Sequence, residues 1–421
     1  MSLKTHSAQQ NIHRHTLANG ITLLIVENQA ADLVAGRFFF NHAGSIVEKL
    51  DRSGISSLVA SVMTKGTRYL SALEIAEQVE SIGASLGADA GTDYFLCSLK
   101  AVSGDFATIL ALLAEIIRFP SFPPEEVELE KKLTLQNIRS QKEQPFNVAF
   151  DALRSNIYGE HPYGVSILGT EETIPQLTQE TLRQYHQTYL RPDNLTISIS
   201  GRINQESTVR LVEEMFGDWQ IPDSKTRLDL PLAINSEPSE TVIQQETQQS
   251  IVMLGYLGAA VNSKDYPVLK LLSTYLGNGL SSRLFVELRE KRGLAYDVSA
   301  FFPTRLEPAF FVTYMGTAPE NTEIAIALLQ EEVARLSTIE LSESELQGAK
   351  NKLLGQYALG KQTNSEIAQI YGWYESLDLG IDFDQDFQEA IAKVTSQEAK
   401  SVANKYLVNP YISVVRPSLN S

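Results

Sequence analysis

The stretch that decides the fold of this 421-residue chain is an apolar segment that ends in Lys-Gly-Thr: Gly54-Ile55-Ser56-Ser57-Leu58-Val59-Ala60-Ser61-Val62-Met63-Thr64-Lys65-Gly66-Thr67. Its large apolar residues recur at the three- and four-residue spacing of a helix with one buried face, namely Ile55, Leu58, Val59, Val62 and Met63. We therefore expect a buried helix over residues 53–64.

The same segment resembles the Gly-x-x-His-Phe-Leu-Glu-His-x-x-x-Lys-Gly-Thr motif of the pitrilysin or insulinase family of zinc peptidases, with four residues in register: Gly54, Lys65, Gly66 and Thr67. Where the motif has His, Glu and His, this chain has Ser57, Ala60 and Ser61. A catalytic zinc needs imidazole or carboxylate ligands and a general base for its water. Two hydroxyls and a methyl group supply neither.

The resemblance also locates the position of the third zinc ligand. In the family this ligand is a Glu about 76 residues beyond the second His. The same interval leads from Ser61 to Asn137, in a charged helical segment that ends before Pro145. An Asn amide is a poor zinc ligand compared with a carboxylate. The resemblance thus implies a degenerate site at Ser57, Ala60, Ser61 and Asn137, no metal on this chain, and no hydrolysis by the isolated chain.

Further short motifs of the family follow in order along the first half. They are Ile82-Gly83-Ala84, Asp93-Tyr94, His161-Pro162-Tyr163-Gly164 and Leu190-Arg191-Pro192-Asp193-Asn194-Leu195. Each motif is weak alone, but their order and spacing make the resemblance strong. Within the family, the chain is similar to the non-catalytic alpha subunit of the mitochondrial processing peptidase.

An internal duplication organises the chain. Thr178 to Tyr189 and Thr395 to Tyr406 span equal intervals, and each is followed by a Pro and a strand; the copies lie 217 positions apart (395 minus 178). The strand 33–40 has its counterpart in 250–256. We expect two similar domains. The predicted boundaries are an N-terminal domain over 1–220, a polar linker over 221–235 and a C-terminal domain over 236–421.

Each half runs from strands into helices and then returns to a strand. In the first half we expect strands over 20–26, 34–40 and 92–102, and helices over 72–82, 105–117, 124–141, 146–158 and 178–189. Closely spaced strands with period-two alternation indicate a mainly antiparallel sheet with helices on one face. We therefore predict an α+β fold of two such domains, and the resemblance implies a LuxS-like or processing-peptidase-like version of it.

The second half contains, over residues 278–296, a cluster of residues whose chemistry suits a binding site. We expect a helix with Leu284, Phe285 and Leu288 on one face and Gly293 as its C-cap, followed by a strand over 295–301. In the family, an Arg and a Tyr seven residues apart bind the substrate backbone, and they fall here on Arg289 and Tyr296. Arg283 and Arg292 lack this interval to Tyr296.

The side chains suit that role, because a guanidinium donates to peptide carbonyls and a phenol donates to the same group or to an oxyanion. In the alternative interpretation, Arg289 only complements a helix C-terminus and Tyr296 is a half-buried strand aromatic. The family register favours substrate binding. Gly277, Asn278 and Gly279 resemble a short form of the family's substrate-facing glycine-rich loop, although such a triplet is often only a tight turn.

Composition excludes several classes of function. The net charge is −16, from 35 basic and 51 acidic residues, so we expect no nucleic-acid partner. No apolar run is long enough to span a membrane, and the first ten residues have no apolar signal core, so we expect a cytoplasmic protein, or a periplasmic one if a leader has been removed. The single cysteine, Cys97, lies in an apolar strand and is expected to be a packed thiol.

The resemblance implies a non-catalytic, substrate-binding subunit of a heteromeric zinc metallopeptidase that cleaves peptides or small unfolded proteins. Zinc would be supplied by a partner chain of the same family with an intact His-x-x-Glu-His motif. One alternative is a scaffold protein of the same fold, as in respiratory-complex core subunits. Another is a homodimer that binds peptides without cutting them.

Overall fold

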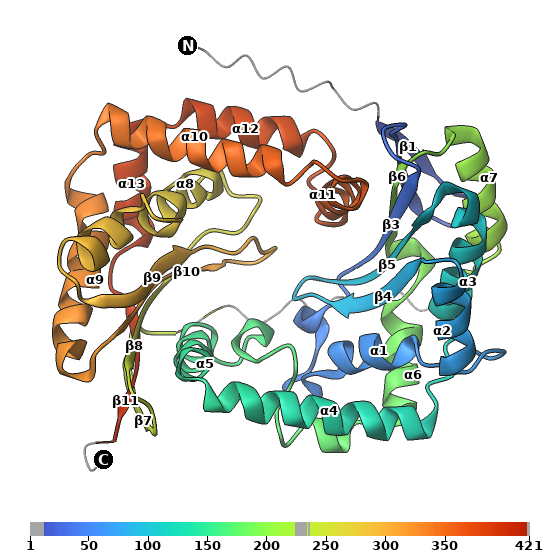
Figure 1. The fold of residues 1–421 in the computed structure, drawn as a ribbon, viewed down its shortest axis with the longest axis horizontal. Coiled ribbons are helices and arrows are strands. Elements are labelled where there is room, and N and C mark those ends of the chain that lie inside the picture. Colours follow the sequence, from blue (N-terminus) through green and yellow to red (C-terminus); the bar gives the residue numbers. More distant parts are fainter. Residues whose placement is uncertain (1–11, 224–233, 235, 419–421) are drawn as a thin grey trace.

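The computed structural model describes residues 12–223, 234 and 236–418, which form two similar α+β halves (Figure 1). The sheet of the first half has six strands in the order β1-β2-β6-β3-β5-β4. Its strands are β1 Ile12–Thr16, β2 Thr22–Glu27, β3 Leu33–Asn41, β4 Ser85–Ala90, β5 Tyr94–Val102 and β6 Leu195–Gly201. The sheet of the second half has the order β7-β11-β8-β10-β9. Its strands are β7 Glu240–Gln245, β8 Ser250–Leu257, β9 Ala295–Phe301, β10 Phe310–Thr317 and β11 Tyr411–Pro417.

The two sheets repeat one topology. In the first, β6 lies parallel to β2 and antiparallel to β3, and in the second β11 lies parallel to β7 and antiparallel to β8. The remaining pairs are antiparallel, so each described sheet is mixed with one parallel pair. The second sheet thus matches the first without β1. The predicted α+β duplication is confirmed, with β3 and β8 in equivalent places.

The helices of the first half are α1 Ile55–Met63, α2 Ala72–Ser81, α3 Phe106–Arg118, α4 Pro124–Glu143, α5 Pro145–Tyr158, α6 Gln179–Tyr189 and α7 Gln205–Phe216. Those of the second are α8 Tyr266–Gly277, α9 Thr322–Thr338, α10 Glu343–Leu359, α11 Asn364–Ser376, α12 Phe383–Lys393 and α13 Ser396–Tyr406. The predicted helix ends are close to those observed. Helix α2, for example, begins at a capping box in which Ser71 N donates to Glu74 at 2.8 Å.

Each sheet has its main apolar core on one face. In the first half the face is covered by helices that include α1, whose predicted apolar residues are all buried. In the second half the core lies between the sheet and helices that include α8 and α9. The prediction of helices on one face holds for these cores, but it describes only half of the packing.

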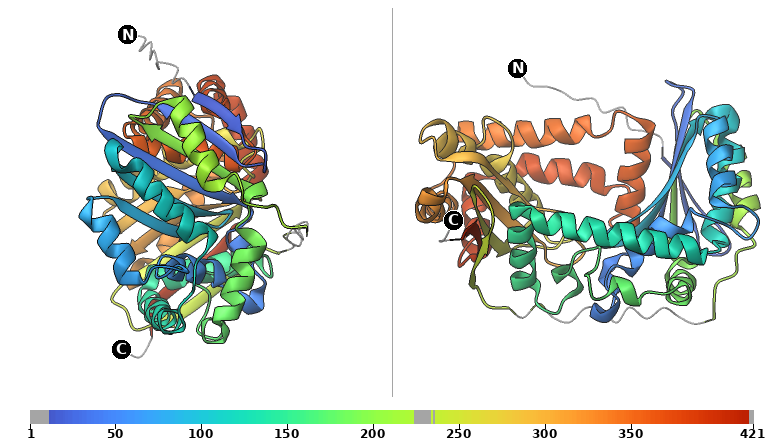
Figure 2. Two further views of the ribbon diagram at one scale, coloured as in Figure 1. Left: turned by 90° about the vertical axis from the view of Figure 1, so that its right-hand side faces the viewer. Right: turned by 60° about the horizontal axis from the view of Figure 1, so that its bottom comes forward.

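The opposite face of each sheet is covered by a helix from the other half. Helix α5 packs against β8 and β11, and helix α11 packs against β3 and β6 (Figures 1 and 2). Both contacts need a glycine. A Cβ at Gly255 on β8 would lie 2.7 Å from Ile157, and a Cβ at Gly372 on α11 would lie 2.7 Å from the Phe39 ring. The halves therefore exchange one helix each.

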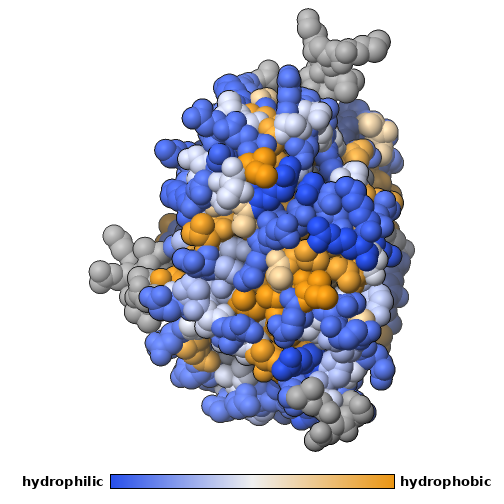
Figure 3. Space-filling view, turned by 90° about the vertical axis from the view of Figure 1, so that its left-hand side faces the viewer, coloured by the Kyte–Doolittle hydropathy of each residue, from blue (hydrophilic) through white to orange (hydrophobic). Residues whose placement is uncertain are grey.

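The predicted linker over 221–235 falls mainly on residues 224–233 and 235, which lie outside the described residues. The outer face of the second half is largely hydrophilic around an apolar patch (Figure 3). Within the described part of the chain, none of the helices has an apolar stretch long enough to cross a bilayer.

Candidate functional site

The degenerate metal positions lie on two neighbouring helices, α1 and α4. Lys65, one turn beyond Ser61, forms an ion pair with Glu130 of α4, with its Nζ 3.3 Å from the carboxylate. Asn137 lies seven residues beyond Glu130 and therefore on the same side of α4. Helix α1, which carries Ser57 and Ser61, thus lies beside helix α4, which carries Asn137. The Asn137 side chain is exposed.

The residues present do not fit a zinc ion. The Ser61 hydroxyl donates to the Ser57 carbonyl at 3.1 Å, and Ala60 is buried with only a methyl group to offer. Among residues 12–223, 234 and 236–418, no three His, Cys, Asp or Glu side chains gather into a group that could hold a metal. Hydroxyl and amide oxygens without a carboxylate or imidazole are a weak donor set for zinc.

Helix α1 is nevertheless firmly held, by a residue that sequence reasoning missed. The Glu48 carboxylate accepts hydrogen bonds from the Gly54 and Ser56 backbone N–H groups, each at 2.8 Å, and from the Ser56 hydroxyl. A negative group at a helix N-terminus is favourable. Burial nevertheless raises the pKa of Glu48 to about 7. Helix α1 is therefore anchored at its N-terminus by the Glu48 carboxyl group.

Arg289 lies in a short π-helix over Phe285–Glu290, and this finding corrects the prediction of a regular α-helix. Its exposed guanidinium lies over the Phe285 ring at 5.1 Å and forms no ion pair with any described residue. Arg283, by contrast, is bound by Glu332 at 2.7 Å and by Glu287 at 3.1 Å. Of these two arginines, Arg289 is the one with free donors.

Tyr296 lies at a break in the pairing between β9 and β10. Gly316 pairs with Asp297 and Thr317 pairs with Ala295, so the register skips Tyr296, which has no partner residue on β10. Its side chain is 59% exposed, and β9 is an edge strand. Both π-helices and β-bulges are found preferentially at functional sites, where they re-aim side chains. Arg289 and Tyr296 each lie on such an irregularity and each faces solvent.

The neighbouring Gly277-Asn278-Gly279 triplet has mainly structural contacts. Gly277 is the buried last residue of α8, and a Cβ there would lie 1.7 Å from the Ala300 backbone nitrogen. The Asn278 amide exchanges two hydrogen bonds with the Gln356 amide, at 2.7 and 3.1 Å. Helix packing therefore accounts for glycine at 277. Gly279 is exposed with φ of 76°, as a turn requires.

Two of the short sequence motifs meet at the contact between the halves. The Tyr163 hydroxyl donates to Asp93, and the other oxygen of Asp93 accepts from the Leu306 N–H at 3.4 Å. Tyr158, on α5, donates to the Pro308 carbonyl at 2.9 Å. Asp93, Tyr158 and Tyr163 therefore hold the β9–β10 loop of the second half against the first half.

Comparisons with known proteins agree with this architecture. The insulinase (peptidase family M16) model matches residues 24–171, and the model of the peptidase M16 inactive domain matches residues 176–353. A protein named uncharacterized zinc protease YmxG, from Bacillus subtilis, is 28% identical over 417 residues, which cover 97% of this chain and 99% of that protein. The uncharacterized zinc protease SCO5738 from Streptomyces coelicolor is 25% identical over 417 residues, which cover 96% and 90%.

Solved structures share the fold over almost the whole chain. The crystal structure of the peptidase M16 inactive domain from Pseudomonas fluorescens has a TM-score of 0.90 at 25% identity, and the match covers 97% of this chain and 99% of that one. A protease from Helicobacter pylori has a TM-score of 0.88 at 21% identity, with 97% and 100% covered.

Proposed function

Because the chain belongs to the insulinase (M16) peptidase family, we propose that it is the non-catalytic, substrate-binding subunit of a two-chain zinc peptidase. The zinc and the general base would lie on a second family member that has an intact His-x-x-Glu-His motif. The observation that carries the proposal is the contrast between two parts of one chain. Helix α1 is preserved with Ser57, Ala60 and Ser61 at the metal positions, while Arg289 and Tyr296 are exposed.

The chemistry of the exposed pair supports this division of labour. A guanidinium has five N–H donors and a phenol has one, so both can bind the carbonyl oxygens of an extended peptide. Donors aimed at a carbonyl also stabilise the oxyanion that forms when water attacks it. Arg289 and Tyr296 would act on a peptide whose attacking water is activated by the partner. The name zinc protease, which the relatives carry, would then apply to the two-chain enzyme.

The test is a peptide-cleavage assay on the chain alone, on the partner alone and on the complex. The partner would be isolated by co-purification and recognised by its intact motif. We expect cleavage that depends on zinc only when both chains are present. In the complex, Arg289→Ala and Tyr296→Phe should each lower kcat/KM by about a hundredfold, the effect of removing one oxyanion donor.

Arg292→Ala is the matched control, because Arg292 is an exposed arginine three residues beyond Arg289. It should leave kcat/KM unchanged. Zinc-dependent cleavage by the isolated chain would overturn the proposal. If the complex cleaves peptides and neither substitution slows it, the subunit assignment survives and the roles of Arg289 and Tyr296 are wrong.

A further inference from the structure

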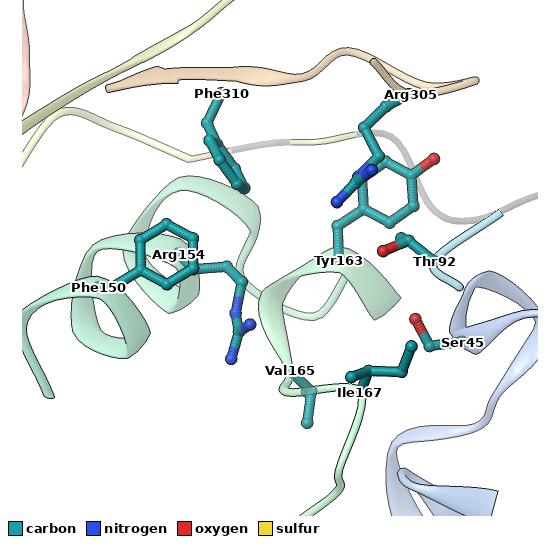
Figure 4. Close-up of a pocket in the computed structure, with 9 residues that line it drawn as sticks. All are labelled: Ser45, Thr92, Phe150, Arg154, Tyr163, Val165, Ile167, Arg305 and Phe310. Atoms are coloured by element: carbon teal, nitrogen blue, oxygen red, sulfur yellow. The ribbon is translucent and has the colours of Figure 1, made fainter. Parts of the chain in front are cut away.

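A cavity of about 170 Å³ lies between the two halves, and neither Arg289 nor Tyr296 is among the described residues that line it (Figure 4). It is lined mainly by the first half, through α5 and several connecting segments, and on the other side by Arg305 and Phe310 of the second half. The β9–β10 loop that carries Arg305 is held in place by the Asp93 and Tyr163 contacts described above. The cavity therefore exists only while the two halves are together.

Of the described residues that line the cavity, two are arginines and none carries a carboxylate. The Arg154 guanidinium points into it from α5 and the Arg305 guanidinium points into it from the loop (Figure 4). Arg154 binds Asp151 through Nη2 at 2.8 Å, but its Nε is buried without a hydrogen-bond partner. Arg305 donates to the Thr304 carbonyl at 3.0 Å and forms no ion pair within the described residues.

The environment leaves these charges poorly compensated. Burial lowers the pKa of Arg154, and the nearby positive charge of Arg305 lowers it further, against the opposing effect of Asp151. Asp93 attracts Arg305 electrostatically, but its two oxygens already accept from the Tyr163 hydroxyl and from the Leu306 N–H. Arg154 and Arg305 are partly buried, and cations that lose water while their donors stay unused are costly unless an anion joins them.

The rest of the lining describes the anion that would fit. The hydroxyls of Ser45 and Thr92 point into the cavity (Figure 4), and neither forms a hydrogen bond within the described part of the chain. The other walls are the apolar side chains of Phe150, Val165, Ile167 and Phe310 and the side chain of Tyr163, whose hydroxyl is engaged by Asp93. Guanidinium forks match the planar, two-oxygen geometry of a carboxylate, and the apolar walls match a short hydrocarbon body.

We propose that this cavity is a binding site for a small carboxylate with an apolar body, held by Arg154 and Arg305 together with the Ser45 and Thr92 hydroxyls. The group is supplied either by a free short-chain acid or by the C-terminal residue of a peptide. Because its two cations come from different halves, the bound carboxylate fastens the halves to each other. This site is separate from the proposed peptidase role and does not depend on it.

The test is calorimetric titration of the full chain with isovalerate, with isovaleramide, and with a short peptide that ends in leucine either as the free acid or as the amide. We expect saturable binding of isovalerate that raises the melting temperature, and no binding of isovaleramide. Tighter binding of the free-acid peptide would identify a peptide C-terminus as the source of the carboxylate. Binding of isovalerate alone would identify a free acid.

Arg154→Gln and Arg305→Gln should each weaken isovalerate binding at least about tenfold, since each removes a charge-assisted hydrogen bond. Arg202→Gln, at an exposed arginine outside the cavity, should leave the affinity unchanged. If Arg154→Gln does not fold, Ser45→Ala and Thr92→Val test the same cavity. The proposal is overturned if neither carboxylate binds, if isovaleramide binds as tightly as isovalerate, or if binding persists in both folded arginine variants.

Discussion

Alanine at position 372 provides a sharp test of how α11 holds the two halves together. Gly372 lies in the interior of α11, buried against the first sheet. An added Cβ would lie 2.7 and 2.9 Å from two atoms of the Phe39 ring and 2.8 Å from the Ser198 Cβ. Carbon atoms in contact prefer about 3.5–4.0 Å, so the helix or the sheet must shift by roughly 1 Å.

Two opposing effects set the size of the change. Glycine to alanine inside a helix favours the folded state by about 1 kcal/mol, whereas overpacking of this kind costs about 1–3 kcal/mol. With three contacts shorter than 3.0 Å, we place the cost near the upper end of that range. We therefore expect Gly372→Ala to lower the free energy of unfolding by about 1–2 kcal/mol.

The matched control is Gly348→Ala, in the interior of α10, where an added Cβ meets no atom within 4 Å. It has the same helix-propensity gain without the clash, so it should raise stability by up to about 1 kcal/mol. Urea denaturation followed by circular dichroism gives both midpoints at unchanged m-value. Equal shifts for the two variants, or a stable Gly372→Ala protein, would refute the argument that close packing at Gly372 fixes α11 to the first sheet.

Three further predictions follow from buried side chains. Between pH 4.5 and about 7, Glu48 keeps its proton in the folded protein but releases it in the unfolded chain. Its contribution of about 3 kcal/mol to the free energy of unfolding is therefore lost as pH rises through that window. Glu48→Gln should remove this loss, measured as the change of the urea midpoint with pH. His161 is buried, and its pKa is lowered by burial to about 4. Its contribution is therefore lost as pH falls from 6.5 towards 4, and an unchanged pH profile in His161→Gln would contradict this. Cys97 is fully buried, and its thiol should react with a thiol reagent only after unfolding; modification of the native protein at the unfolded rate would show otherwise.

The sequence was sufficient for most helices of the first half and for the duplication, because local periodicity and capping carry that information. Helix α1 is an example, since its apolar spacing alone identifies its buried face. Strand β4 escaped prediction because Gly87 and its alanines have low strand propensity, and its pairing with β5 decides the conformation. In β6, alternating small polar residues suggest a solvated face, yet Thr196, Ser198 and Ser200 are all buried beneath α11.

The candidate sites could also be predicted only in part from the sequence. The resemblance located Arg289 and Tyr296 as residues, but the π-helix and the unpaired position at Tyr296 depend on how β9 meets β10. The cavity between the halves was invisible in the sequence, because Arg154 and Arg305 lie far apart along the chain and share no motif. A helix pattern reveals that a face is buried, but not which partner buries it.

The helix exchange has a consequence for the order in which the protein is made. A ribosome synthesises the chain starting from its N-terminus. The first sheet is complete once Gly201 has emerged. Its second face stays bare until α11, which begins at Asn364, has been synthesised. Helix α5 in turn cannot find its partner strand β11, the last of the described strands, until that strand has been synthesised. Native docking of the two halves therefore cannot be completed until both α11 and β11 have emerged, and a growing polypeptide must shelter an open sheet face for much of its translation.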